Sequence, residues 1–407
     1  MAIQYLSKLN LKNQAIILRP DLNCPIKNGQ VADDFRILQS LPTIQKLLGD
    51  KNKLIICGHL GRPKGEWKAE FSFRPVAKNL ANLLGMKFVE TDFVLPDYNI
   101  PHVIFFTGDL RQTATLEQIC KISAKDVVFL ENLRFYPEEE KNVTAFANLL
   151  SSLANAFVLD GFGVVHHPAV SVTGLAKCLP ACAGLLLEKE IKALDMVLKH
   201  AKQPFVVMTG GVKLSEKVGA LENLGKLASK ILVGGGVANL MFKVKGYEVG
   251  VSKLEEAESK TAWHILQNFK HKLILPVDVV VANKEMDKAS IRVCSPHEVT
   301  PNEQILDAGP KTIMQFAKII KTAKTLVWSG PLGFYEKPPF HNATFALSRL
   351  IGGQGKGKTF VVVGGGDTVD AVRQSHQFDH IDHVSTGGGA MLEYLAGKKL
   401  AGIESLK

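Results

Sequence analysis

Three glycine triplets in the second half of the chain are the first candidates for chemistry. Each stands at or just after an apolar run that favours a β-strand, at residues 234–236, 364–366 and 387–389. Glycine lets the backbone approach an anion closely, and a strand that turns into a helix points free N–H groups and the positive helix dipole at that anion. The triplets therefore predict phosphate-binding turns, although a tight turn alone would explain any single one.

The triplet that starts at Gly364 continues into Asp367 and Thr368. A carboxylate beside a phosphate would be repelled unless a divalent cation lay between them. None of the triplets fits a Walker motif or a spaced dinucleotide fingerprint. The pattern favours a nucleotide that carries a metal ion.

Arginine is distributed very differently from glycine. The chain has nine arginines, and residues 135–291 contain none. Because the guanidinium fork grips phosphate or carboxylate at two points, arginines are good candidates for anion binding. Six of them lie in the first third of the chain: Arg19, Arg36, Arg62, Arg74, Arg111 and Arg134.

Composition limits the class of protein. With 407 residues and 46% hydrophobic content, the chain is long enough for two domains of roughly 200 residues. Met1-Ala2-Ile3-Gln4 shows no charged-then-apolar leader, and no apolar run reaches the ~18 residues of a membrane span, so we expect a soluble, cytoplasmic protein. The six cysteines lack a usual zinc spacing and are expected to be reduced and mostly buried.

The net charge of +10 permits nucleic-acid binding, yet the sequence contains no stripe of basic and aromatic residues. An anionic small substrate explains the charge equally well. We therefore expect neither a nucleic acid nor a membrane as a partner.

Short β-rich runs alternate with helical patterns along the whole chain. Such continuous apolar runs are typical of parallel strands covered on both faces, so the pattern predicts an open, doubly wound α/β sheet. In the first half we expect strands at 15–18, 54–57, 127–130 and 156–159, and helices at about 34–48, 73–84 and 143–154.

A second series of strands follows an amphipathic segment at 185–198, which predicts a connecting helix. The strands of this series are expected at 205–208, 231–233, 273–275, 325–328 and 360–363. Ligands bind outside the carboxyl ends of parallel strands, so the residues directly after each strand are the ones to examine.

Polar residues and glycines follow nearly every expected strand, at 19–23, 58–63, 131–135, 160–163, 210–217 and 328–333. Together with Asp33-Asp34-Phe35-Arg36-Ile37, Asp307-Ala308-Gly309-Pro310-Lys311 and the terminal run 383–390, these motifs resemble the phosphoglycerate kinase family. The resemblance runs in order over essentially the whole chain. It implies two Rossmann-like domains joined by a long helix and hinge, and a magnesium-dependent phosphoryl transfer from 1,3-bisphosphoglycerate to ADP, giving 3-phosphoglycerate and ATP.

The resemblance also implies a domain plan. Residues 1–183 would bind the triose phosphate, 184–200 would form the connecting helix, 201–388 would bind the nucleotide, and 389–407 would pack back toward the first domain. The two sites would meet on domain closure. Most relatives act as single chains, so we expect a monomer.

Site residues carried over by the resemblance fall into two sets. The triose phosphate would be held by Asp21, Asn23, Arg36, His59, Arg62, Arg134 and His167. The nucleotide would be held by Gly211, Lys213, Lys217, Gly235, Gly236, Pro331, Glu336, Gly364, Gly365, Gly366, Asp367 and Thr368, with Glu336 on the ribose, the first triplet under adenine and Mg²⁺ at Asp367. Arg36, Lys213, Gly366 and Gly389 would stabilise the transferring phosphoryl group.

The chain departs from the family pattern in the loop after the strand at 156–159. His167 stands where the family has a substrate-binding arginine, while Ser329 replaces an asparagine and Pro20 a common valine. An imidazole with an ordinary pKa near ~6.5 replaces a permanent cation there. We therefore expect weaker triose-phosphate binding that improves as the pH falls.

Several site residues have simpler alternative roles. Asp21 and Asn23 could form a turn, Arg134 a salt bridge to Glu138 or Glu139, and Asp367 a helix cap. The histidines His376, His380 and His383 have metal-like spacing, but a solvated loop is the favoured interpretation.

Two alternative functions remain at this point. The chain could be a paralogue that binds nucleotide with little or no turnover. A nicotinamide-dependent dehydrogenase would need a spaced glycine fingerprint after the first strand, which residues 19–23 do not provide.

Overall fold

A computed structural model describes residues 3–91 and 100–407. The expectation of no leader concerned the segment that begins with Met1 and Ala2. These two residues lie outside the described residues. The chain divides into two compact units. The first comprises Met1–Ile191 and Lys399–Lys407, and the second comprises Lys192–Lys398.

The first unit is built on a seven-stranded sheet with the order β5-β6-β7-β4-β1-β8-β9, in which neighbouring strands run parallel. The strands are β1 (Ala15–Arg19), β4 (Lys53–Ile56), β5 (Lys87–Thr91), β6 (His102–Phe106), β7 (Val127–Leu130), β8 (Ala156–Leu159) and β9 (Ala181–Ala183). A short hairpin is formed by β2 (Ile26–Lys27) and β3 (Gln30–Val31). The helices are α1 (Phe35–Gly49), α2 (Arg74–Leu84), α3 (Thr113–Lys121), α4 (Pro137–Glu140), α5 (Thr144–Ser151) and α6 (Leu175–Cys178).

The central strands of this sheet are apolar on both faces. All residues of β7 and β8 are buried, as expected for parallel strands that are covered on both sides. Strand β1, which pairs with β8 and β4, adds Ile16 and Leu18 to a core that includes Phe73 and Phe129. The packed strands fix the positions of the loops that follow them.

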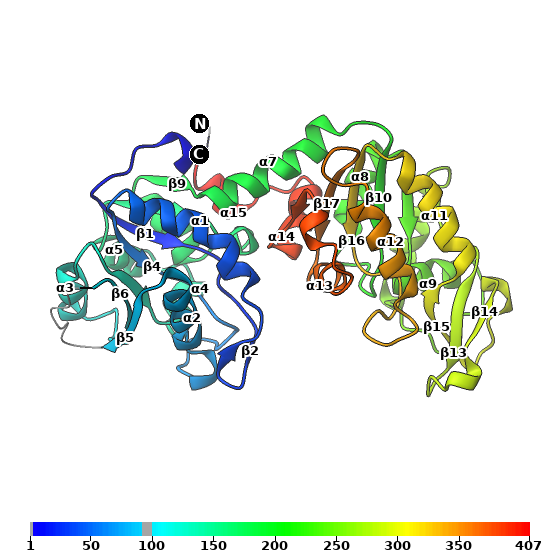
Figure 1. The fold of residues 1–407 in the computed structure, drawn as a ribbon, viewed down its shortest axis with the longest axis horizontal. Coiled ribbons are helices and arrows are strands. Elements are labelled where there is room, and N and C mark those ends of the chain that lie inside the picture. The colour runs from blue at the N-terminus through cyan, green and yellow to red at the C-terminus, as the bar shows by residue number, and fades with distance from the viewer. Residues whose placement is uncertain (1–2, 92–99) are drawn as a thin grey trace. The chain divides into compact units, whose positions relative to one another are not determined.

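The last residues of the chain belong to the first unit. Figure 1 shows α15 (Ala401–Glu404) at the red end of the colour scale, and this helix contacts the segment Val170–Gly174 of the first unit. The backbone N–H of Gly402 donates to Val165 O at 2.7 Å. A Cβ on Gly402 would lie 2.9 Å from the Val172 side chain and 3.0 Å from Val165 Cα, so only glycine fits this contact.

The second unit has a six-stranded parallel sheet with the order β12-β11-β10-β16-β17-β18. Its strands are β10 (Phe205–Thr209), β11 (Lys230–Val233), β12 (Leu273–Ile274), β16 (Thr325–Ser329), β17 (Phe360–Gly364) and β18 (His383–Val384). Its helices are α8 (Val218–Leu227), α9 (Gly235–Val244), α10 (Ser259–Asn268), α11 (Pro310–Thr322), α12 (Asn342–Gly352), α13 (Gly366–Gln374) and α14 (Gly388–Leu395). The expected α/β class with parallel sheets is confirmed.

A separate antiparallel sheet with the order β14-β13-β15 was not expected from the sequence. It comprises β13 (Val279–Asn283), β14 (Arg292–Cys294) and β15 (Glu303–Ala308). Its strands are short and partly polar. Their pattern of apolar residues is therefore a weaker strand signal than the continuous apolar runs of the buried parallel strands.

Helix α7 (Leu185–His200) leads from the first unit into the second. It runs two residues beyond the expected end at residue 198. Its first turn is anchored by the buried Asp160, whose Oδ1 accepts from the backbone N–H groups of Leu186 at 2.9 Å and Leu187 at 3.2 Å. A carboxylate at a helix N-terminus also complements the helix dipole.

Over residues 3–91 and 100–407, no helix combines the length and the apolar character needed to cross a bilayer.

Candidate active site

In the first unit, the turn after β1 holds Arg36 in place. Asp21 is buried, and its Oδ2 lies 3.3 Å from Arg36 Nη1. The same Nη1 donates to the backbone oxygen of Asn23 at 3.0 Å. About a third of the Arg36 side chain, 31%, stays exposed, so the guanidinium is oriented by the turn and still open to a ligand. The simpler turn interpretation holds as well, since Asp21 Oδ1 accepts from Asn23 N at 3.3 Å.

The loop after β4 is tied to this turn and to Arg134. Asn23 Oδ1 accepts from the N–H of Gly61 at 3.0 Å, and the carbonyl of Gly61 accepts from Arg134 Nη1 at 2.8 Å. Gly61 has φ +61° and a Cβ there would lie 2.3 Å from the Phe71 ring, so the position requires glycine. The predicted residues Asn23 and Arg134 thus meet at one loop.

Arg134 also forms an ion pair, but its partner differs from the expected one. Its Nε lies 3.2 Å from Glu140 Oε1, whereas the alternative drawn from the sequence named Glu138 or Glu139. These three acids are consecutive residues of the short helix α4, and only the turn geometry decides which of them faces Arg134. Arg62, in the loop after β4, is exposed.

His59 is 6% exposed and lies beside Arg19. Its Nδ1 is 2.8 Å from Arg19 Nη2. Burial, followed by the charges of Arg19, Arg134 and Arg36, holds the pKa of His59 well below its usual value. The histidine is therefore neutral at physiological pH.

His167 lies in an exposed position of the loop after β8. Its ring centroid is 3.9 Å from that of His166, at an interplanar angle of 44°. His167 is also one of the groups whose charge lowers the pKa of His59. The structure thus brings His59, Arg36, Arg134 and His167 into one electrostatic environment.

Sequence reasoning assigned no role to three buried residues of this region, Arg19, Ser171 and Glu139. Arg19 stood out only as an arginine at a strand end, and Glu139 was considered only as a partner of Arg134. Their contacts join segments 32 and 152 residues apart, so no local spacing could reveal them.

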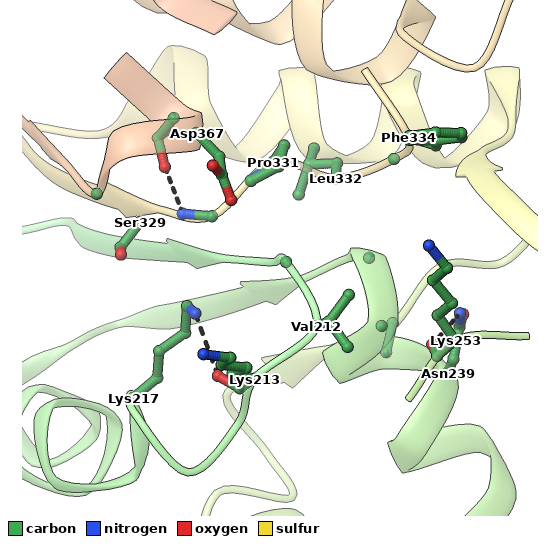
Figure 2. A pocket seen from close by; sticks show the side chains of 18 of the residues that line it. Val212, Lys213, Lys217, Asn239, Lys253, Ser329, Pro331, Leu332, Phe334 and Asp367 are labelled. Carbon is green, nitrogen blue, oxygen red and sulfur yellow. Dashed lines mark hydrogen bonds between the residues drawn. The ribbon is translucent and has the colours of Figure 1, made fainter. Parts of the chain in front are cut away.

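In the second unit, a pocket of about 670 Å³ lies where the parallel strands end and three helices begin (Figure 2). Most of the residues predicted to bind nucleotide line it. They are Gly211, Lys213, Lys217, Gly235, Gly236, Pro331, Glu336, Gly365, Gly366, Asp367 and Thr368, together with Gly389. Gly364 ends β17 and does not belong to the lining, because it is packed against Met391, whose Sδ would lie 2.3 Å from a Cβ at that position.

The glycines of this pocket fall into two kinds. Gly365 has φ +94°, and a Cβ on Gly388 would lie 2.9 Å from Gly365 Cα, so the fold itself requires glycine at both places. At Gly366 and Gly389 a Cβ would meet nothing within 4 Å, and neither has a positive φ. The protein's own packing gives no reason for these two glycines, whereas a ligand at the starts of α13 and α14 would.

Two lysines follow β10 in the loop at 210–217. Lys217 is 8% exposed, and its Nζ donates to the Lys213 backbone oxygen at 3.1 Å, as the dashed line in Figure 2 shows. Burial lowers its pKa, while Glu216 and Asp367 oppose that change. Lys213 is exposed and pairs with Glu216 at 2.9 Å. One ammonium is thus buried in the pocket wall, whereas the other is exposed and paired with a surface carboxylate.

Asp367 lies in the first turn of α13, but it does not cap the helix. The N-cap residue is Gly365, and no side chain caps it, so the alternative of a capping role for Asp367 is wrong. Its neighbour Thr368 is buried, and its Oγ1 accepts from the N–H of Gly330 at 2.6 Å. Thr368 therefore joins the loop after β16 to the start of α13.

No group of three or more His, Cys, Asp or Glu side chains that could hold a metal ion occurs in the described part of the chain. Mg²⁺ is usually bound by one or two carboxylates together with phosphate oxygens and water, so the single carboxylate of Asp367 fits it. The histidines at 376, 380 and 383 form no ligand set either. The expectation of a solvated loop is wrong for His383, which is buried in β18.

The other end of the pocket is largely apolar. Phe242, Met286, Leu332 and Phe334 line it, and Figure 2 shows Val212 and Leu332 coming from opposite walls. Lys253 adds an ammonium group 5.8 Å from the centre of the Phe334 ring. A flat, partly polar group such as a nucleobase fits between such walls.

Comparison with known proteins decides the family. The model of the family described as Phosphoglycerate kinase matches residues 6–398. The chain belongs to the phosphoglycerate kinase family. The corresponding activity is that of a glycolytic phosphotransferase, EC 2.7.2.3, and the family uses ATP or ADP with phosphoglycerate substrates.

Individual relatives agree over their full lengths. The phosphoglycerate kinase of Pelotomaculum thermopropionicum is 38% identical, with 100% of this chain and 99% of that protein covered. That of Finegoldia magna is also 38% identical, with 98% of both covered. Among solved structures, the enzyme of Coxiella burnetii has a TM-score of 0.84 and 36% identity, covering 100% of this chain and 99% of that one.

Proposed function

We propose that this chain transfers a phosphoryl group between the carboxylate of 3-phosphoglycerate, held by the first unit, and the terminal phosphate of a Mg²⁺-bound adenine nucleotide, held by the second. The observation that carries the proposal is the open space at Gly366 and Gly389. Two uncapped helix starts meet there beside a lysine-bearing loop and one carboxylate, which is the combination that a metal-bound triphosphate requires.

In the first unit, the triose phosphate would be bound mainly by positive charge. Arg36, Arg62 and Arg134 offer guanidinium forks. Asp21 holds Arg36, and Asn23 holds the loop at Gly61 to which Arg134 donates. His59 would offer a neutral hydrogen-bond donor, and His167 would add an exposed imidazole. Because phosphoglycerate is multiply negative, several converging cations are needed to hold it.

In the second unit, the nucleotide would lie with its phosphates at the glycine-rich end. Gly211, Gly235 and Gly236 would approach the base, Pro331 and Glu336 the ribose region, and Lys217 the phosphates. Asp367 would hold the Mg²⁺ ion, which when bound neutralises phosphate charge. Gly365 and Thr368 would keep the first turn of α13 in the shape that presents its N–H groups.

The reaction needs no general base, because the attacking carboxylate is already ionised at neutral pH. One carboxylate oxygen forms a bond to the terminal phosphorus of ATP, and the bond between that phosphorus and the bridging oxygen of ADP breaks. Arg36, Lys213 and the N–H groups at Gly366 and Gly389 would stabilise the charge in transit. Because these groups belong to two units, turnover requires the units to close and exclude water.

We also propose that the enzyme acts as a monomer in the cytoplasm. The proposal rests on the residues assigned to each ligand lying within one compact unit of a single chain. Sedimentation of the purified protein would test the monomer.

A coupled assay with 3-phosphoglycerate, ATP and Mg²⁺ tests the function directly. The proposal expects turnover in the usual range for kinases, about 1–100 s⁻¹. Turnover near background, with ATP binding intact in calorimetry, would instead support the alternative of a nucleotide-binding paralogue. Running Gly366→Ala in parallel shows whether any measured activity uses the pocket of the second unit.

A further inference from the structure

Arg19 is a buried cation with a protein partner at each of its three guanidinium nitrogens. It ends β1 and is 2% exposed, although a guanidinium is always charged. Its Nε donates to Ser171 Oγ at 2.8 Å, its Nη1 donates to the backbone oxygen of Pro20, and its Nη2 lies 2.8 Å from His59 Nδ1. A residue held in this way is unable to reach out to a substrate and must act through its neighbours.

The direction of the hydrogen bonds around Ser171 is fixed. Its Oγ donates its single proton to Glu139 Oε1 at 2.5 Å, and its backbone N–H donates to Glu139 Oε2 at 3.0 Å. The hydroxyl oxygen is therefore left to accept from Arg19 Nε. Burial raises the pKa of Glu139, while Ser171 and Arg19 oppose that rise. The buried charge of Arg19 is thus balanced through Ser171 by a buried acid.

We propose that Arg19 is a positioning residue that holds His59 as the tautomer protonated on Nε2, so that the triose phosphate receives a hydrogen bond from a neutral imidazole. A guanidinium has donors and no acceptor, so the nitrogen that faces it, Nδ1, must carry a lone pair. The single proton of the neutral ring then sits on Nε2. The inference rests on the proposed role of His59 as a substrate ligand.

The surroundings of His59 keep the ring neutral. Burial is the largest cause of its lowered pKa, and the charges of Arg19, Arg134, Arg36 and His167 add to it in that order. A further cation among these groups would be repelled, whereas a neutral donor adds a hydrogen bond without repulsion. His59 therefore supplies a contact to the anion that stays constant across physiological pH.

The network also depends on two features of the surrounding chain. Gly58 leaves room for Arg19, since a Cβ there would lie 3.3 Å from Arg19 Nη1 and 3.1 Å from the Phe73 ring. Ser171 comes from the helical segment Val170–Gly174, directly after the loop that carries His167. The segment directly after the loop in which this chain departs from its family therefore supplies the acceptor that orients Arg19.

Nitrogen-15 NMR of the histidine rings tests the proposal without using activity. With His59→Gln to assign the signals, we expect a proton on Nε2, a bare Nδ1 and no titration between about pH 5.5 and 8. In Arg19→Met the ring should titrate in that range or populate both tautomers. The KM for 3-phosphoglycerate should rise about tenfold, the loss of one good hydrogen bond, with kcat changed less than about threefold.

Two further variants sharpen the result. Arg19→Lys keeps a cationic donor and should restore the Nε2 tautomer in part. Arg74→Met removes an exposed arginine that pairs with Glu90 at the surface and should leave both readouts unchanged. If Arg19→Met fails to fold, the spectrum of the unmodified protein still decides, since it reports the tautomer directly.

A proton on Nδ1 in the unmodified protein, or a His59 signal that titrates near neutral pH, would overturn the proposal. So would an Arg19→Met spectrum identical to that of the parent. Failure of the proposed role of His59 as a substrate ligand would be seen separately. If His59→Gln leaves the KM for 3-phosphoglycerate unchanged, His59 is no substrate ligand, whatever its tautomer.

Discussion

The two units offer different kinds of anion-binding group. The first uses side chains, the cations of three arginines together with two histidines, and a chain of contacts from Asp21 and Asn23 to Gly61 positions Arg36 and Arg134. The second uses backbone: helix starts with uncapped N–H groups and glycines that leave space. A charge-based site is sensitive to single side chains and to pH, while a backbone site is sensitive to any added atom.

Removing the partly exposed cation of the first unit should have the largest effect. In Arg36→Met we expect kcat/KM to fall by about 10²–10³, because the variant loses a group that stabilises the moving charge. Steady-state kinetics measure the loss. Binding of ATP by the second unit, followed by calorimetry, should not change, and a matching loss of ATP affinity would contradict the division between the units.

Adding one methyl group to the second unit should weaken nucleotide binding. Gly366→Ala places a Cβ in the open space at the start of α13 and should weaken ATP binding by about tenfold to a hundredfold. Folding should be unharmed or stabilised by up to about 1 kcal/mol, since alanine is the better helix residue. Calorimetry and urea denaturation provide the two readouts.

Gly365→Ala is the matched control for that variant. Its φ of +94° disfavours alanine, so it should lose stability as well as ATP affinity. If Gly366→Ala is destabilised as strongly as Gly365→Ala, the glycine at 366 serves packing, and the argument from open space is wrong.

The substitution His167→Arg should strengthen the binding of 3-phosphoglycerate by the first unit, by a smaller factor. A permanent cation should lower the KM for 3-phosphoglycerate about threefold to tenfold at pH 8, and less at pH 6, where the histidine gains charge. Kinetics at both values check this. An unmodified enzyme whose KM is constant between about pH 6 and 8 would show that His167 does not contact the substrate.

The smallest effect concerns stability at the start of α7. Burial raises the pKa of Asp160 to about 6. A raised folded-state pKa adds stability that is present below the unfolded value near ~3.9 and is lost as the pH rises through about 6. In Asp160→Asn, the free energy of unfolding should fall less steeply as the pH rises through this range. Urea titrations between about pH 4 and 7 would show it, and an unaltered slope would mean that another group titrates.

Much of the fold could be predicted from sequence because buried parallel strands leave an unmistakable apolar signal. The strands at 127–130 and 156–159 agree residue for residue, and β1, β10, β16 and β17 extend only one residue further, to Arg19, Thr209, Ser329 and Gly364. These extra residues are polar or glycine, and hydrogen bonds of the ladder, not burial preference, place them in the strands. The strands of the antiparallel sheet show no comparable run of apolar residues.

The site was predictable in its residue types but not in its internal bonding. Glycine triplets and arginines at strand ends are visible as patterns, whereas the contact of Arg19 with Ser171 crosses 152 residues and that of Ser171 with Glu139 crosses 32. The choice of Glu140 over its neighbours as the partner of Arg134 depends on one turn of α4. Which glycines serve the fold and which serve a ligand also becomes visible only from the space around them.

Hydrogen–deuterium exchange with each ligand alone tests the central claim most directly. The account predicts that 3-phosphoglycerate slows exchange at residues 20–23 and 58–62 of the first unit, and that ATP with Mg²⁺ slows it at 365–368 and 388–391 of the second. Protection of the same unit by both ligands, or protection of 365–368 by 3-phosphoglycerate alone, would contradict it.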